Sequence, residues 1–287
     1  MIRKKQINSE SGPFDTGENS KNYITLSQTS LYFFSTLLLV MTFISGYFFG
    51  KVNGNEKTSQ PTVAPSQQAL PQAQQPAQPQ ISLDTIKGLF TKDVVKFGKG
   101  DKKLLMVEVS DPSCPYCHVA GGANPEIGSQ MGPQFKLVAQ GGTYVPPLPE
   151  MKKLVDQGKA DFVWLYTNGH GNGELATKAI YCAFDQGKFW QAHDLLLSAK
   201  GYTLINDVVK NDATKSQQVA DFLSSAVDKN KLKGCLDSGK YDARLGEDSA
   251  LARSLGVNGT PGFFLNTTNF SGAYSWSDMK SVADAAL

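Results

Sequence analysis

The residues with the clearest chemical potential are two cysteines separated by two residues, Cys114 and Cys117. They lie in the sequence SDPSCPYCH, residues 110–118, which directly follows the apolar and β-rich run LLMVEV. A Cys-x-x-Cys pair just past the end of a strand predicts a redox-active dithiol. The spacing lets the two sulfurs meet, so that Cys114 can attack and Cys117 can resolve.

A helix that begins at Pro115 would place Cys114 at its N-terminus. Proline suits the first helical position, where its missing N–H group has no consequence. Unpaired backbone N–H groups and the helix dipole favour a thiolate over a thiol at that end. The sequence therefore predicts that Cys114 is the activated sulfur.

Two other interpretations involve the same residues, Cys114 to His118. The sequence Cys-x-x-Cys-His, ending at His118, is also the attachment signature of a c-type haem, with His118 as axial ligand. A Cys-x-x-Cys pair is also half of a zinc site, but the other cysteines, Cys182 and Cys235, do not form a second such pair. If neither applies, His118 is expected on the surface of the first helix, and no metal is expected.

Glu108 is the unusual residue of the expected strand 103–109. One alternative is a carboxyl buried beneath Cys117, where desolvation would raise its pKa. It could then take and return the proton of the resolving thiol. The other alternative is a side chain that faces solvent.

Charged residues are fewer in residues 1–80 than in the expected folded part, residues 81–287. Residues 1–80 hold six Lys/Arg and four Asp/Glu, whereas residues 81–287 hold 22 of each. A neutral domain with scattered charge is not typical of a nucleic-acid binder. The 207 residues from 81 onward suffice for a substantial core.

The N-terminal part predicts a tether in three sections. Residues 1–30 are polar and predict a disordered cytoplasmic tail. Residues 31–50 hold 20 uncharged, mostly apolar residues, the length of a transmembrane helix. This run is longer than the core of a cleaved signal peptide, which favours a retained anchor. Residues 51–80 are rich in Pro and Gln and predict an extended, disordered linker.

Basic residues flank this expected anchor unevenly, with four before it and two after it. The difference favours an N-terminus inside the cytoplasmic membrane and a C-terminal domain outside it. Disulfides form and persist on that side.

The remaining chain alternates helical and strand patterns. The expected elements are helix 81–90, strand 93–97, strand 103–109, helix 151–155, strand 161–167, a helical block over about 174–238, helix 241–255, a strand directly after Pro261, strand 270–274 and helix 277–287, capped by Ser277.

Cys182 and Cys235 lie within or at the edge of the helical block. An even number of cysteines in an exported domain favours a structural disulfide between them. A second catalytic pair and two free buried thiols are the alternatives.

The dithiol and a distant Thr-Pro pair together resemble the thioredoxin superfamily. The residues that carry this resemblance are Cys-Pro-Tyr-Cys at 114–117, followed by the helical block and then Gly-Thr-Pro at 259–261 before a strand. The block's sequence AIYCAFDQGKFWQAHDLLL, residues 179–197, is similar to that of the DsbA-like thiol–disulfide oxidoreductases. The resemblance implies an α/β, thioredoxin-like fold with an inserted helical domain over residues 81–287.

The resemblance also implies roles for individual residues. Cys114 would be an exposed nucleophile and Cys117 a buried resolving thiol. Thr260 and Pro261 would be joined by a cis peptide whose backbone pairs with substrate. Glu108 would match the buried acid of the DsbA pattern. Pro115 and Tyr116, between the cysteines, would contact substrate beside the Thr-Pro pair.

The expected function is an extracytoplasmic oxidase that introduces disulfides into exported proteins, with no bound cofactor. Its partners would be protein thiols and a membrane quinone-linked reoxidase of the DsbB or vitamin K epoxide reductase type. The Pro-Tyr dipeptide at 115–116 differs from the Pro-His of the prototype oxidase, and Thr260 is more like isomerases and reductases. An isomerase or reductase, a haem-bearing electron carrier and a non-catalytic binding domain are the alternatives.

Overall fold

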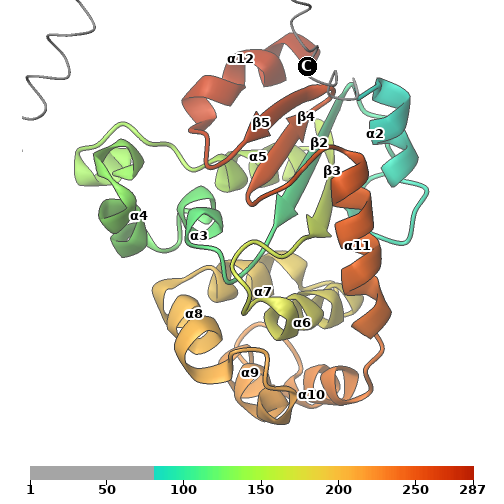
Figure 1. The fold of residues 1–287 in the computed structure, drawn as a ribbon. Helices are drawn as coiled ribbons and strands as arrows, with labels where there is room; N and C mark the ends of the chain where they lie inside the picture. Colours follow the sequence, from blue (N-terminus) through green and yellow to red (C-terminus); the bar gives the residue numbers. More distant parts are fainter. Residues whose placement is uncertain (1–80) are drawn as a thin grey trace, which may run out of the picture. The chain divides into compact units, whose positions relative to one another are not determined.

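The computed structural model describes residues 81–287, which lie in one compact unit (Figure 1). The expected tail at 1–30, anchor at 31–50 and linker at 51–80 lie outside the described residues. Within residues 81–287, no helix combines the length and the apolar character needed to cross a membrane.

A five-stranded mixed sheet forms the centre of the unit, in the order β1-β3-β2-β4-β5. The strands are β1 (Val95–Phe97), β2 (Leu104–Ser110), β3 (Ala160–Tyr166), β4 (Gly262–Leu265) and β5 (Thr268–Ser271). Only β2 and β3 run parallel, and the other neighbours are antiparallel. Every residue of β2 and β3 is buried, as expected for apolar strands at the centre of a covered sheet.

Helices cover both faces of this sheet (Figure 1). They are α2 (Leu83–Leu89), α3 (Pro115–Gly121), α4 (Pro125–Met131), α5 (Pro147–Asp156), α6 (Glu174–Asp185), α7 (Phe189–Leu196), α8 (Ala199–Thr203), α9 (Ser216–Phe222), α10 (Lys229–Asp237), α11 (Asp242–Ser254) and α12 (Trp276–Ala286). Short 3₁₀ turns span Pro133–Phe135, Val138–Gln140 and Ala213–Lys215, and a π-helical turn spans Leu204–Val209.

Alternation along β2 divides the core into two layers. Leu105, Val107 and Val109 pack with residues of α2 and α11 on one face. Leu104 and Met106 pack on the opposite face, in the larger cluster that includes residues of α3, α6 and α7. Because side chains two positions apart share a face, Glu108 and Ser110 belong to this second face, on the side of the dithiol.

Helices α6 to α10 follow β3 and form the block at the lower end of the sheet in Figure 1. Cys182 on α6 and Cys235 on α10 are joined by a disulfide with an S–S distance of 2.00 Å. This is the pairing that the sequence favoured over a second catalytic pair. The bond links two helices whose cysteines lie 53 positions apart.

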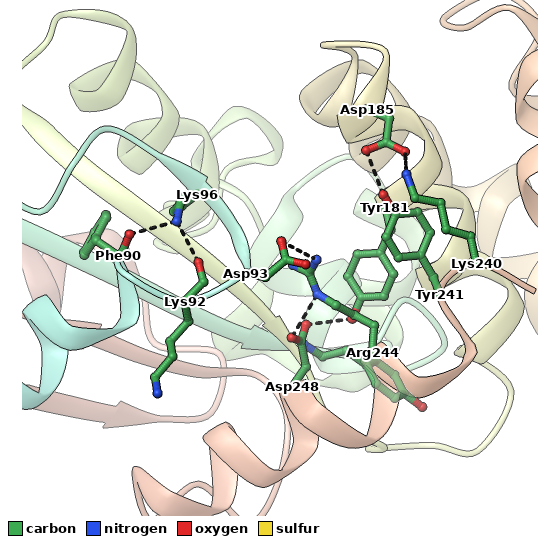
Figure 2. Close-up of polar contacts among 11 residues, drawn as sticks. Phe90, Lys92, Asp93, Lys96, Tyr181, Asp185, Lys240, Tyr241, Arg244 and Asp248 are labelled. Carbon is green, nitrogen blue, oxygen red and sulfur yellow. Dashed lines mark hydrogen bonds and ion pairs between the residues drawn. The ribbon is translucent and has the colours of Figure 1, made fainter.

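A buried polar network ties α11 to the sheet and to α6 (Figure 2). The Asp248 carboxylate accepts hydrogen bonds from the Tyr181 hydroxyl at 2.6 Å and from the Tyr166 backbone N–H at 3.2 Å. Arg244 lies 3.4 Å from Asp248 and 3.3 Å from Asp93. Since α11 leads into residues 257–261, the network fixes the direction from which the chain enters the Thr-Pro pair.

The structure moves several expected boundaries. Helix α5 begins at Pro147 rather than at Met151, because Pro147 occupies the first helical position. The last helix begins at Trp276, and its N-cap residue is Ser275 rather than Ser277. The Ser275 hydroxyl accepts a hydrogen bond from the Val145 backbone instead. The first and last strands are displaced or shortened, to 95–97 and 268–271, an ordinary uncertainty at element ends.

Candidate redox site

The dithiol lies at the start of α3, directly after the turn that follows β2 (Figure 1). Cys114 is the N-cap residue, with an extended backbone, and Pro115 stands in the first turn. The Cys114 carbonyl accepts hydrogen bonds from the backbone N–H groups of Cys117 and His118, at 3.0 and 3.3 Å. The Cys114 sulfur is therefore placed at the helix end where the macrodipole favours an anion.

The Thr-Pro pair meets the dithiol across the sheet. A cis peptide bond joins Thr260 and Pro261. β4 begins at the next residue and pairs with β2, with Gly262 opposite Val109. This register carries the Thr260 carbonyl to 3.4 Å from the Cys114 sulfur, a distance at which the protonated thiol donates a hydrogen bond to it.

The two sulfurs have opposite electrostatic environments. The side chain of Cys117 hydrogen-bonds to the Cys114 sulfur and lowers its pKa from 9.0 to about 6, with smaller contributions from Thr260 and from backbone N–H groups of α3. Burial raises the pKa of Cys117 well above 9.0, and the neighbouring Cys114 raises it further. Cys114 is thus the thiolate and Cys117 the thiol, the division that a nucleophile and a resolving group need.

Both cysteines are free and buried, with Cys114 4% exposed and Cys117 fully covered. Cys114 is therefore less exposed than the resemblance implies. The Thr260 carbonyl lies against its sulfur. Tyr116, between the two cysteines, is 39% exposed and presents its ring at the surface.

Glu108 is buried rather than solvent-facing. It lies in the middle of β2, opposite Trp164 of β3 and Phe263 of β4. Neither carboxylate oxygen has a hydrogen-bond partner among residues 81–287, although Oε2 lies 4.0 Å from Nε2 of His193. Burial raises the pKa of the Glu108 carboxyl. This is the environment that the buried alternative required.

His118 is a correction to the sequence analysis, which expected a surface residue. Its ring is fully buried, with Nδ1 2.8 Å from the Leu197 carbonyl and Nε2 2.8 Å from the Pro112 carbonyl. Burial lowers its pKa to about 4. The chain after α7 covers this side of α3, at a separation of 79 residues that sequence periodicity does not reveal.

The contacts of His118 also bear on the haem and zinc alternatives. Both ring nitrogens face backbone carbonyls, so the ring would have to leave its site to ligate a haem iron. Among residues 81–287, no group of three or more His, Cys, Asp or Glu is arranged to hold a metal ion. The described part of the chain thus lacks the further ligands that a zinc site needs.

Asp111 is a site residue that the sequence analysis missed. Its Oδ1 accepts hydrogen bonds from the backbone N–H and hydroxyl of Ser113, at 2.8 and 2.7 Å. Its Oδ2 accepts from the backbone N–H groups of Gly169 and His170, at 2.8 and 2.9 Å. Asp111 thus holds the turn before α3 and the loop after β3 together. The available signal was an Asp two residues before a Ser, a common pattern in turns.

A groove of about 450 Å³ lies beside the dithiol and the Thr-Pro pair. Aromatic side chains supply much of its lining, which includes Tyr116, Phe135, Tyr144, Thr260 and Tyr274. The Phe135 ring packs edge-on against Tyr116 and Tyr144, with centroids 5.7 and 5.6 Å apart. The segment between α3 and α5, whose role the sequence left open, therefore builds one wall of the groove.

A thioredoxin family model matches residues 148–285, slightly less than half of the chain. The match spans β3, the helical block and the Thr-Pro pair but begins after the dithiol. The solved structure of the thiol-disulfide exchange protein alpha-DsbA2 from Wolbachia pipientis has a TM-score of 0.50 and 18% identity. The likeness covers 71% of this chain and 97% of that one. Residues 81–287 form a thioredoxin-like domain.

Curated relatives add two further likenesses. Disulfide bond formation protein D of Bacillus subtilis is 21% identical over 197 residues, which cover 66% of this chain and 75% of that protein. The Na(+)/H(+) antiporter NhaA 1 of Salinispora arenicola is 26% identical over 197 residues. The chain spans only 24% of the antiporter's length.

Proposed function

We propose that this chain is an extracytoplasmic thiol–disulfide oxidoreductase that introduces disulfides into exported proteins through Cys114 and Cys117. One relationship carries the proposal: a sulfur with a lowered pKa, at a helix N-terminus, lies 3.4 Å from the carbonyl that precedes a cis proline. The buried Cys117 stands beside it as a thiol with a raised pKa. This pairing supports stepwise disulfide exchange.

The reaction begins with the oxidised dithiol. A substrate thiolate attacks the Cys114 sulfur, the Cys114–Cys117 bond breaks, and Cys117 leaves with the bonding electron pair and takes up a proton. A mixed disulfide now joins Cys114 to the substrate. A second substrate thiolate attacks the substrate sulfur of that bond, and Cys114 leaves as a thiolate. Two electrons have passed from the substrate to the enzyme.

The stabilised thiolate favours the oxidising direction. A pKa of about 6 keeps Cys114 ionised at neutral pH, which stabilises the reduced enzyme and makes its disulfide a stronger oxidant. The groove beside Tyr116 and Thr260 offers an aromatic surface to an unfolded polypeptide. We assign substrate contacts to Pro115, Tyr116, Thr260 and Pro261 on this basis.

The proposal includes the cell context that the sequence predicts. Residues 31–50 would anchor the chain in the cytoplasmic membrane, with the thioredoxin-like domain outside, and residues 51–80 would act as a spacer. A membrane quinone-linked reoxidase of the DsbB or vitamin K epoxide reductase type would restore the Cys114–Cys117 disulfide. The Cys182–Cys235 disulfide is compatible with this oxidising location.

The test measures whether the chain oxidises or reduces its substrate and whether that activity depends on Cys114 and Cys117. The full chain, purified in detergent micelles, should oxidise reduced ribonuclease, and Cys114→Ser should abolish the activity. Cys117→Ser should accumulate a mixed disulfide at Cys114. The equilibrium reduction potential against glutathione separates the alternatives, since it is about −120 mV for DsbA and about −270 mV for thioredoxin. A value near that of thioredoxin would reject the oxidase and favour a reductase.

A further inference from the structure

Glu108 and His193 form a buried pair whose polar atoms are left unused by the rest of the domain. Glu108 is fully buried and His193 is 1% exposed. Both oxygens of Glu108 and Nε2 of His193 lack a hydrogen-bond partner among residues 81–287, and Oε2 lies 4.0 Å from Nε2. Buried polar groups are rarely left unpaired, because each costs free energy. The unpaired oxygens of Glu108 and Nε2 of His193 therefore need an explanation, and a function is one.

Aromatic packing fixes the ring of His193. It stacks on Phe189 with a centroid distance of 5.4 Å and meets Trp190 edge-on at 5.9 Å. The second nitrogen, Nδ1, lies 3.3 Å from Oδ1 of Asp194, whose side chain is 62% exposed. The ring therefore has one nitrogen toward the buried carboxyl and the other toward a carboxylate in solvent.

Asp194 opens onto a second cavity, distinct from the groove beside Tyr116. This cavity of about 610 Å³ is lined by Gly121, Gly122, Trp190 and Asp194 among others. Gly121 ends α3 and Gly122 caps it, so the cavity lies at the C-terminal end of the helix whose first residues carry the dithiol. His193 itself does not line this cavity, so Asp194, which lies 3.3 Å from its Nδ1 atom, is the group that connects the ring to the cavity.

The inner end of the pair leads toward Cys117. Ser110 lies two residues beyond Glu108 on the same face of β2. The backbone N–H of the next residue, Asp111, lies 3.5 Å from the Cys117 sulfur. The Ser110 side chain lowers the pKa of the Glu108 carboxyl and of the Cys117 thiol, so it lies near both groups. Ser110 and Glu108 are therefore the polar side chains of this face of β2 through which a proton could pass between Cys117 and His193.

We propose that His193 and Asp194 form the outlet of a proton path that serves Cys117 through Glu108. The inference rests on the proposed function. When the Cys114–Cys117 bond breaks, the Cys117 thiolate takes a proton from the Glu108 carboxyl by way of Ser110. The His193 imidazolium returns a proton to Glu108, and water at Asp194 reprotonates the ring. In the reverse direction each proton moves outward. His193 is a positioning residue, since it acts on the sulfur only through Glu108.

Other charged groups surround the ring and belong to its environment. Glu108 faces it from β2 and Asp194 from its own helix. His118 on α3 lies close enough for a charge on His193 to lower the pKa of His118. Lys152 on α5 lies 5.8 Å from the centroid of the Trp190 ring, which contacts His193.

The test follows single-turnover reduction of the Cys114–Cys117 disulfide in the full chain across pH. General acid–base groups contribute about 10²–10⁴-fold, so we expect His193→Gln to slow the step about tenfold or more and to change the pH profile of its rate. The ultraviolet titration of the Cys114 thiolate should stay unchanged. Glu108→Gln should cause a similar loss, and the double variant little more, because the two residues act in series.

Two further variants guard against a folding defect. Imidazole added to His193→Ala should restore part of the rate through the cavity, which a structural role cannot explain. Asp194→Asn changes only an exposed side chain and should slow the step in the same direction by a smaller factor. His170→Gln, at an exposed histidine, should change nothing.

Some outcomes would refute the proton path through His193 without contradicting the proposed oxidoreductase function. An unchanged rate and pH profile in His193→Gln, with full activity in the unsubstituted chain, would refute the relay alone. So would a slowed His193→Ala that imidazole does not restore, together with a normal Asp194→Asn. Activity that survives Cys114→Ser would instead refute the proposed function.

Discussion

The carbonyl oxygen of Thr260 lies 3.4 Å from the sulfur of Cys114, although 146 positions separate the two residues. The antiparallel pairing of β2 with β4 creates this approach, because the dithiol follows the end of one strand and the Thr-Pro pair precedes the other. A backbone that pairs with Thr260 would therefore bring its own sulfur beside Cys114. The strand pairing in the sheet, rather than the two loops, therefore sets the distance between the Thr260 carbonyl and the Cys114 sulfur.

Gly169 should be intolerant of a side chain because of its position against this pair. A Cβ atom at Gly169 would lie 1.9 Å from Oγ1 and 3.0 Å from Cβ of Thr260, so Gly169→Ala must shift Thr260, the residue beside the Cys114 sulfur. We expect the disulfide-exchange rate to fall about tenfold, with the pKa of Cys114 rising, and a stability loss of about 1–3 kcal/mol. Stopped-flow reduction and urea unfolding measure the two effects.

Gly246→Ala is the matched control for that substitution. Gly246 lies within α11, and no described atom comes within 4 Å of its added Cβ. Alanine is the better helix former by about 1 kcal/mol, so this variant should be as stable or slightly more stable, with normal exchange. A normal exchange rate in Gly169→Ala would show that the loop has more room than the structure gives it.

The reduced protein should gain stability with pH through the thiolate of Cys114. The folded pKa of about 6 lies below the ordinary 9.0, so the stabilisation is complete above pH 9 and is lost as the pH falls through about 6. Its full size is on the order of 4 kcal/mol, at 1.36 kcal/mol for each pKa unit. Urea unfolding of the reduced chain and of reduced Cys114→Ala should diverge by about this amount. Curves that stay parallel from pH 6 to 9 would contradict the prediction.

The sequence predicted the parts of this site that depend on local signals. Cys114 at a helix N-terminus follows from Cys-Pro after a strand. The cis peptide before Pro261 came from the resemblance, since a proline at a strand start fits a trans bond as well. The burial of Glu108 could not be decided locally, since one acid in an apolar strand fits a buried or an exposed face. The pairing with His193 on α7 required the tertiary fold.

Other parts of the site had no local signal. His118 has the spacing of a surface helical residue, and only the chain after α7, which supplies Leu197, buries it. Asp111 bonds a loop more than 50 positions away. The groove joins Phe135 and Tyr144 to Tyr274, which are brought together only when α12 docks. Packing between distant parts of the chain, rather than local secondary-structure propensity, determines the burial of His118, the contacts of Asp111 and the lining of the groove.

His118 should make the domain sensitive to mild acid. Its folded pKa of about 4 lies below the ordinary 6.5, so the unfolded chain binds the proton first and stability falls as the pH drops from 6.5 to 4. The loss from this group is on the order of 3 kcal/mol. His118→Phe removes the one N–H that the neutral ring donates to a backbone carbonyl and should cost about 1–3 kcal/mol at neutral pH. The stability gap to the unsubstituted chain should narrow toward pH 4, as urea unfolding can measure.

His170→Phe serves as the control, because His170 is exposed in the loop after β3. Its unfolding curve should follow that of the unsubstituted chain at every pH. A constant gap between His118→Phe and the unsubstituted chain from pH 7 to 4 would show that folding does not lower the pKa of His118.

Removal of the Cys182–Cys235 disulfide should affect stability and spare the chemistry. The bond closes a loop of 53 residues in sequence separation, for which the chain-entropy account gives about 4 kcal/mol. The double variant Cys182→Ala, Cys235→Ala should therefore unfold at a lower urea concentration while its exchange rate and Cys114 titration stay normal. A large loss of exchange rate in the folded double variant would assign this pair a role in the reaction.

Asp111→Asn should damage the site and the fold together. The carboxylate accepts four hydrogen bonds, from Ser113, Gly169 and His170, and an amide can accept them at only one of its two ends. We expect a stability loss of about 2–4 kcal/mol, since hydrogen bonds to charged groups are the stronger ones. The exchange rate should also fall about tenfold, because the loop that carries Gly169 packs against Thr260.

Asp161→Asn is the control that separates the loss of stability from the loss of exchange rate. Asp161 is also buried, and its carboxylate accepts backbone N–H groups of Lys99, Gly100 and Asp101 at the opposite end of β3. All of these bonds reach one oxygen, Oδ2, which the amide oxygen of Asn can replace, so Asp161→Asn loses only the added strength of bonds to a charged acceptor, and its stability loss should be smaller than that of Asp111→Asn. The exchange rate and the Cys114 titration should remain normal, because its loop is remote from the dithiol. If both variants slow exchange equally, the loss is a general consequence of weakened folding, and Asp111 has no specific part in positioning Thr260.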